Sequence, residues 1–100
     1  MSVRLTERNT DRGLLVAAAD AAIVGETYDN GTVSVTVEPS FYGDADSETD
    51  ADALAASLGR ASVANLVGDI AVTTAIDAGY VAEANVVDLG GVPHAQYLRL

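Results

Sequence analysis

The sequence contains no cysteine and no lysine, and each absence narrows what the protein can be. Without cysteine, disulfide bonds and thiolate metal sites are excluded. Without lysine, a P-loop for nucleotide phosphates is excluded as well. The five basic residues are all arginine and stand against fifteen aspartates and glutamates, which gives a net charge of −10. Only 5% of the residues are aromatic, and there is a single histidine.

This acidic, lysine-free composition, with small apolar residues in place of large ones, is typical of proteins from salt-accumulating archaea. At molar salt the electrostatic screening length falls to about 3 Å, so an acidic surface repels itself little and stays hydrated. We therefore interpret most carboxylates as surface solvation. The net charge then reflects adaptation to a salty solvent more than the choice of a partner. By itself it does not exclude RNA as a partner.

The chain of 100 residues is expected to form one domain, residues 1–100. With 49% hydrophobic and 20% charged residues it reads as globular. No apolar run approaches the ~20 residues of a membrane span. The polar and apolar alternation at the N-terminus does not resemble a signal peptide. We expect a cytoplasmic protein without membrane contact.

The first half of the chain is rich in strand signals. "SVRLTE" and "TVSVTV" alternate polar and apolar residues, which predicts half-buried strands. "LLVAAAD" and "AAIVGETY" are apolar and predict two more strands, and "DNG" is a strong hairpin turn. These segments together predict a meander of four strands that ends at Pro39.

Helix signals follow. Asp50 is a good N-cap for a first helix that stops at Gly59. A second helix, running to Gly79, is predicted from apolar residues spaced i, i+3, i+4 and i+7, namely Val63, Leu66, Val67 and Ile70. Gly68 would lie inside that helix, where we attribute it to a close helix–sheet contact.

The last part returns to strands, with a short one around Val86–Leu89, a Gly-Gly-Val-Pro turn and a final strand from Ala95. The predicted fold class is α+β. We expect an antiparallel or mixed sheet, built from the N-terminal four-strand meander plus a C-terminal strand, with two consecutive helices packed on one face.

The candidate binding site is the turn "GGVPHAQ". His94 is the only side chain whose unperturbed pKa lies near neutrality, which suits a ligand contact, although a structural role is the more common one for a lone histidine. Gly90 and Gly91 fit a tight turn, and their exposed N–H groups could also hold an anion, with Glu26 or Asp88 orienting the imidazole. No nucleophile or second histidine stands at a fixed spacing, so we expect no catalytic residue, no metal and no cofactor.

Two polar residues complete the candidate site. Gln96 falls on the same side of the last strand as Leu98, which predicts that it points inward toward the second helix. A buried amide needs a partner, and Asn65 is the polar residue best placed by type to supply one. The segments "NLVG" and "GGVPHAQ" are thus expected to touch, with His94 at the rim.

Arginines are the candidates for contacts with nucleic acid. Arg4, Arg8 and Arg12 recur every four residues and share a face if the first strand continues. Arg99 would join them if the first and last strands pair. Such a cluster would suit RNA phosphates, which are usually contacted by arginine or lysine.

Aromatic residues could supplement those contacts. Phe41 and Tyr42 stand in a polar loop, where they either cover the core or stack on a base. Tyr97 is a second candidate for stacking.

Three segments, "SFYGD", "ASVANLVG" and "GGVPHAQYLRL", resemble in their order and spacing the small archaeal proteins named domain of unknown function 424. The likeness spans nearly the whole chain, and "NLVG" and "GGVPHAQ" are its specific parts. The family usually has "FYGG", whereas this chain has Asp44 at the last of these positions. The resemblance implies an archaeal cytoplasmic domain with no assigned reaction, and an association with RNA or translation.

Three functions remain open from the sequence. The first is a non-catalytic binding module for RNA or a ribonucleoprotein of the translation apparatus. The second is a small ligand-binding protein or enzyme with its site around the "GGVPHAQ" turn. The third is a protein-interaction subunit that uses an exposed sheet edge. Nothing indicates DNA as a partner.

Overall fold

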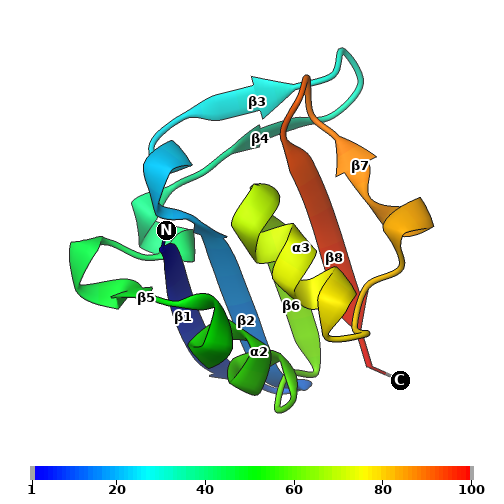
Figure 1. Cartoon of the computed structure of the whole chain (residues 1–100). Helices are drawn as coiled ribbons and strands as arrows, with labels where there is room; N and C mark the ends of the chain where they lie inside the picture. Colours follow the sequence, from blue (N-terminus) through cyan, green and yellow to red (C-terminus); the bar gives the residue numbers. More distant parts are fainter. Residues whose placement is uncertain (1, 100) are drawn as a thin grey trace.

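A computed structural model, which describes residues 2–99, confirms the α+β class (Figure 1). Its main sheet has six strands in the order β5-β1-β2-β6-β8-β7. These strands are β1 (Val3–Thr10), β2 (Gly13–Asp20), β5 (Glu48–Thr49), β6 (Val63–Val67), β7 (Val87–Asp88) and β8 (Pro93–Leu98). Strands β2 and β6 run parallel, and the other neighbouring pairs run antiparallel.

The remaining elements lie on the two faces of this sheet. The helices are α1 (Pro39–Tyr42), α2 (Ala51–Leu58) and α3 (Asp69–Asp77), and a separate hairpin consists of β3 (Thr27–Asp29) and β4 (Ser34–Thr36). Short 3₁₀ turns occur at η1 (Ala21–Ile23), η2 (Ala45–Ser47) and η3 (Glu83–Asn85). Within residues 2–99, no helix is long and apolar enough to cross a membrane.

One face, which we call the helix face, is covered by α2 and α3, as predicted (Figure 1). Its core is aliphatic, with Leu54 and Leu58 of α2 packed with Leu66 of β6 and Val72 of α3. The predicted cap of α2 is confirmed, since Asp50 Oδ1 accepts a hydrogen bond from the backbone N–H of Ala53 at 2.9 Å.

The opposite face, which we call the hairpin face, is covered by α1 and the β3–β4 hairpin, which crosses one end of the sheet in Figure 1. Here Ala17 and Ala19 of β2 lie with Val67 of β6 beneath Tyr42 and Leu89. The small side chains on β2 let the covering segments approach the sheet closely.

The four predicted N-terminal strands do not form one meander. Strands β1 and β2 belong to the main sheet, whereas β3 and β4 pair only with each other. The edge of β2 that a meander would use is occupied by β6, which pairs with it from Leu15 to Ala19. The chain therefore leaves the sheet after Asp20 and turns through η1, so the predicted strand over residues 21–28 keeps only its last part.

The second predicted helix begins later than expected, because residues 63–67 form strand β6. Ala64 and Leu66 face the helices while Val67 faces the hairpin, so the strand is apolar on both sides. A short strand buried on both faces lacks the two-residue alternation that distinguishes strands from helices. Helix α3 follows, and Gly79, with φ of 85°, ends it as predicted.

Gly68 is the N-cap of α3 and not an interior helix residue. Its φ is 107°, and a Cβ there would come within 2.4 Å of Asp20 Cγ. The Asp20 carboxylate uses that space to accept hydrogen bonds from the N–H groups of Ile70 at 3.0 Å and Ala71 at 2.9 Å. The positive end of α3 is therefore neutralised by the protein's own carboxylate.

Candidate functional site

Three of the predicted site residues meet on the hairpin face, although they come from α1, β6 and β8. The hydroxyl of Tyr42 donates to Asn65 Oδ1 at 2.6 Å, and His94 Nε2 lies 3.3 Å from the same oxygen. Tyr42 is 3% exposed and His94 is 9% exposed. This polar cluster joins three elements inside an otherwise apolar layer.

Burial keeps the two titratable members of the cluster uncharged near neutral pH. It raises the pKa of Tyr42 to about 12 and lowers the pKa of His94 below its ordinary value. Because Asn65 Oδ1 is only an acceptor, the neutral imidazole carries its proton on Nε2 to bond it. The other ring nitrogen, Nδ1, is then an acceptor.

Beside His94 lies a cleft with a volume of about 320 Å³. It is formed by the β3–β4 turn, the end of η3, β7 and β8. Its lining residues are Val33, Asn85, Val87, His94, Ala95 and Gln96. None of these carries a charge at neutral pH, in a chain whose net charge is −10. The cleft thus differs in character from the acidic surface around it.

The Gly90-Gly91 turn builds one end of this region by packing on the hairpin. A Cβ on Gly90 would lie 2.8 Å from the carbonyl oxygen of Asp29, so only glycine permits this approach. The side chain of Asn30 donates to the carbonyl of Asp88 at 3.0 Å. The N–H of Gly91 donates to Asp88 Oδ1 at 2.7 Å. This hydrogen bond occupies the N–H that an anion would need, and it directs the Asp88 carboxylate to the turn and not to the imidazole.

Gln96 does not point toward the helices, and this part of the prediction is wrong. It is exposed, while its neighbours Ala95 and Tyr97 pack on the helix face. Alternation assigned Gln96 and Leu98 to one side correctly, but the helices cover the other side of the sheet. Asn65 and Gln96 do lie opposite each other in the β6–β8 register, which confirms the contact between "NLVG" and "GGVPHAQ". His94 lies deeper than the rim position predicted for it.

The arginines do not gather into one patch. Strands β1 and β8 are separated by β2 and β6, so the predicted pairing of first and last strands is wrong. Arg4 pairs with Glu48 at 3.3 Å, and Arg8 donates to the carbonyl of Ser40 at 2.6 Å with its guanidinium over the Phe41 ring. Both lie on the hairpin face.

The other two predicted arginines lie elsewhere. Arg99 bonds the Gly59 carbonyl at 3.3 Å on the helix face, and Arg12 is exposed in the β1–β2 turn. Of the predicted stacking residues, Tyr42 is buried, and Tyr97 packs edge-on against Tyr80 with ring centroids 5.4 Å apart. The ring of Tyr42 is therefore not free to stack on a base.

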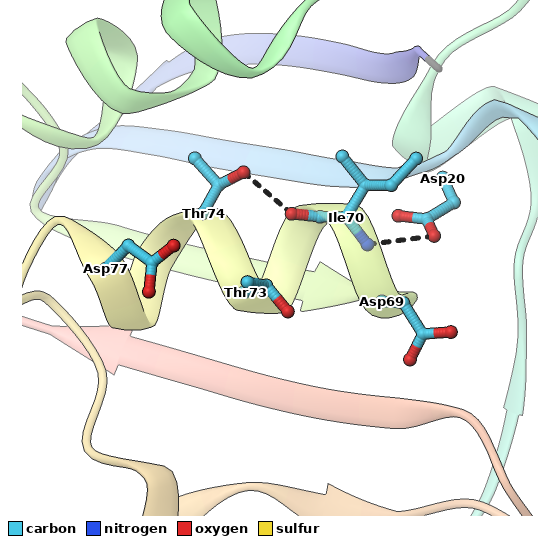
Figure 2. Close-up of a pocket in the computed structure, with 6 residues that line it drawn as sticks. All are labelled: Asp20, Asp69, Ile70, Thr73, Thr74 and Asp77. Carbon is cyan, nitrogen blue, oxygen red and sulfur yellow. Dashed lines mark hydrogen bonds between the residues drawn. The ribbon is translucent and has the colours of Figure 1, made fainter.

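A larger cavity of about 490 Å³, which the sequence did not suggest, runs along α3 (Figure 2). Its lining residues are Asp20, Asp69, Ile70, Thr73, Thr74 and Asp77. Asp20 is engaged as the helix cap, and the hydroxyl of Thr74 donates to the Ile70 carbonyl at 2.7 Å. What remains is a row of acidic and hydroxyl groups one helical turn apart, as expected of a hydrated helix surface. In the described part of the chain, no three His, Asp or Glu residues are grouped to hold a metal.

Comparison with known proteins finds a family with a similar sequence and a solved structure with a similar fold. The sequence model of a family described as "Protein of unknown function (DUF424)" matches residues 7–100. The structure is similar to the "crystal structure of an uncharacterized conserved protein from Methanopyrus kandleri", with a TM-score of 0.75 and 20% sequence identity. That similarity covers 100% of this chain and 96% of the other. No curated protein matches the chain significantly. At 20% identity the structural likeness shows a shared fold alone.

Proposed function

The chain belongs to the DUF424 family of proteins of unknown function, and we propose that it is a non-catalytic binding module that holds a segment of a protein partner in the cleft beside His94. The family supplies no activity, so the proposal rests on the site. The observation that carries it is the position of the exposed large hydrophobic side chains. Among the described residues these are Val33, Val87 and Leu98, with exposed fractions of 41%, 40% and 64%.

Two of these three side chains border the same cleft, and the third lies farther along β8. Val33 and Val87 line the cleft, and Leu98 follows Gln96 by two residues on the same face of β8. Isolated exposed hydrophobic residues are common, whereas grouped ones that border a cleft are typical of interaction sites. A partner that filled the cleft would remove the exposed apolar surface of Val33 and Val87 from water.

The polar cluster beneath the cleft supports binding more than catalysis. His94 contacts an amide and, through it, a phenol that burial keeps un-ionised, and these contacts include no carboxylate that could activate a nucleophile. The hydrogen bonds of the cluster fix the imidazole against the sheet. A fixed, uncharged ring with one free nitrogen is suited to recognition of a ligand group.

RNA is the second candidate, favoured by the amides of Asn85 and Gln96 beside His94. Amide and imidazole groups in an uncharged cleft can hydrogen-bond the edge of an unpaired base. Phosphate contacts would have to come from arginines, but Arg4 and Arg8 are engaged with Glu48, Ser40 and Phe41. The protein partner is therefore the stronger proposal.

Site-specific photocrosslinking in native extract, at the salt of the host cytoplasm, tests both. A photoreactive residue replaces Val33 in one sample and, as the matched control, the exposed Asp52 of α2 in another. We expect a defined protein crosslinked from position 33 and not from position 52, with or without ribonuclease. Crosslinked RNA at position 33 would favour the second candidate, and equal products from both positions would contradict the cleft as a site.

A further inference from the structure

The free ring nitrogen of His94 defines what the cleft can accept. Nε2 is engaged with Asn65, and no described residue bonds Nδ1. Yet among the described residues no side-chain nitrogen or oxygen is both fully buried and unpartnered. Nδ1 therefore keeps some access to solvent, and His94 is one of the residues that line the cleft. The cleft is thus lined by an imidazole that is nine-tenths buried and has one nitrogen without a partner among the described residues.

The hydrogen bond to Asn65 sets the character of this nitrogen. In a neutral imidazole one nitrogen donates and the other accepts. Because Nε2 must donate to the amide oxygen, Nδ1 offers a lone pair to whatever fills the cleft. Tyr42 reinforces this arrangement, since its hydroxyl donates to the same oxygen and holds the amide in place.

The rest of the lining sets the size and polarity of the occupant. A volume of about 320 Å³ lies at the lower end of ligand pockets, which span roughly 300–1,000 Å³, and suits one side chain of a partner better than an extended ligand. Val33 and Val87 offer apolar surface. No lining residue is a carboxylate that would compensate a desolvated ammonium or guanidinium group, which disfavours lysine and arginine.

Building on the proposed function, we propose that the cleft receives an apolar ring with one hydrogen-bond donor, namely a tryptophan side chain of the partner, whose indole N–H donates to His94 Nδ1. Indole is a donor only, so it matches a site whose deepest polar atom is an acceptor. Tryptophan is also enriched among the residues that dominate the binding energy of interfaces. The amides of Asn85 and Gln96 then belong to the polar rim.

The first test is the tautomer of His94, read from the ¹⁵N shifts of its ring nitrogens in the folded protein. We expect a protonated Nε2 and an unprotonated Nδ1. The opposite tautomer would overturn the inference, because Nδ1 would then donate. This measurement needs no ligand and does not depend on the proposed function.

The second test compares indole with benzofuran, which has the same shape but an oxygen in place of the N–H, by titration monitored in ¹H–¹⁵N spectra. One net neutral hydrogen bond predicts that indole binds about 2- to 10-fold more tightly, with shifts at Val33, Val87 and Gln96. In His94→Phe the two probes should bind equally, while Asp52→Asn should retain the preference. If the His94 variant does not fold, the comparison of probes in the unaltered protein decides the question.

Each failure has a separate meaning. Equal binding of both probes in the cleft would overturn the role of His94 Nδ1 and leave the cleft as a binding site. Absence of shifts in the cleft with either probe would overturn the aromatic occupant. Whether the cleft contacts a partner at all is decided by the crosslinking from position 33.

Discussion

The two faces of the sheet are built differently. The helix face is filled by large aliphatic side chains, among them Leu54, Leu58 and Leu66, all completely buried. The hairpin face carries small alanines on β2, a cluster of hydrogen-bonded polar groups and an open cleft. Aliphatic packing stabilises a fold without recognising anything, whereas fixed polar groups beside open space can select a ligand. The comparison suggests that stability is concentrated on one face and binding on the other.

Salt is the largest perturbation, and it should act more on the helix face. The acidic groups Asp69 and Asp77 lie along α3, whereas the cleft is uncharged. The screening length is about 3 Å at 1 M salt and about 10 Å at 0.1 M, so a net charge of −10 repels itself far more at low salt. We expect folding to require molar KCl, with amide exchange in α3 accelerating before exchange in β8 as salt is lowered. Equal stability at about 0.1 M and 2 M KCl would contradict this expectation.

Truncation of the aliphatic core should be the next largest effect. Leu66→Ala removes a completely buried side chain beneath α2 and α3 and should lower the free energy of unfolding by about 2–5 kcal/mol. Leu98→Ala, on the exposed part of the hairpin face, is the matched control and should change stability by less than about 0.5 kcal/mol. Chemical denaturation at constant high salt measures both. A similar loss of unfolding free energy in both variants would contradict the view that stability is concentrated on the helix face.

The sequence predicts much of the helix face because local signals suffice there. Asp50 caps α2 and Gly79 ends α3 through chemistry that lies within a few residues of each helix end. The strand β6 was misassigned because Leu66 and Val67 are apolar on opposite sides, which matches a helical stripe equally well. Its neighbour β2 is far away in the sequence, and no local pattern reveals that pairing.

The site was predicted by residue type but not by arrangement. Tyr42, Asn65 and His94 were all named from the sequence, and the structure brings them within hydrogen-bond distance. Their meeting depends on α1 packing against β1 and β2, which alternation cannot show. Gln96 was placed inward because alternation groups residues into faces without saying which face the helices cover. Val33 and Val87 were missed as cleft residues, since exposed valines in turn and edge segments give no signal of their own.

The polar cluster should contribute moderately to stability. Asn65→Leu leaves the hydroxyl of Tyr42 and the Nε2–H of His94 without their acceptor, and an unsatisfied buried donor costs about 1–3 kcal/mol. Tyr42→Phe removes only one donor and should cost about 0.5–1.5 kcal/mol. In the double variant the two losses should be less than additive, because the phenol no longer needs a partner. Strict additivity in denaturation experiments would show that the hydrogen bond contributes nothing.

The smallest effect expected is a difference between the faces in their response to acid. On the helix face, the hydroxyl of Ser57 and the guanidinium of Arg60 lower the pKa of Glu7. The contribution of Glu7 to stability is therefore present above about pH 4.5 and is lost as the pH falls through the lowered pKa. On the hairpin face, burial lowers the pKa of His94 below 6.5. The unfolded chain then binds the proton more readily, and stability should decline as pH falls from 6.5 toward the pKa of the folded state.

Mild acid should therefore weaken the hairpin face first, at a pH where the Glu7 ion pair is intact. Denaturation midpoints at pH values between about 7 and 5 should decline in the unaltered protein and in Glu7→Gln, and they should be nearly constant in His94→Phe. Because His94 also bonds Asn65 and borders the cleft, the same decline should accompany a loss of the preference for indole over benzofuran, as protonation converts Nδ1 from acceptor to donor. A decline that persists in His94→Phe would assign the pH response to the carboxylates and would separate acid sensitivity from the binding face.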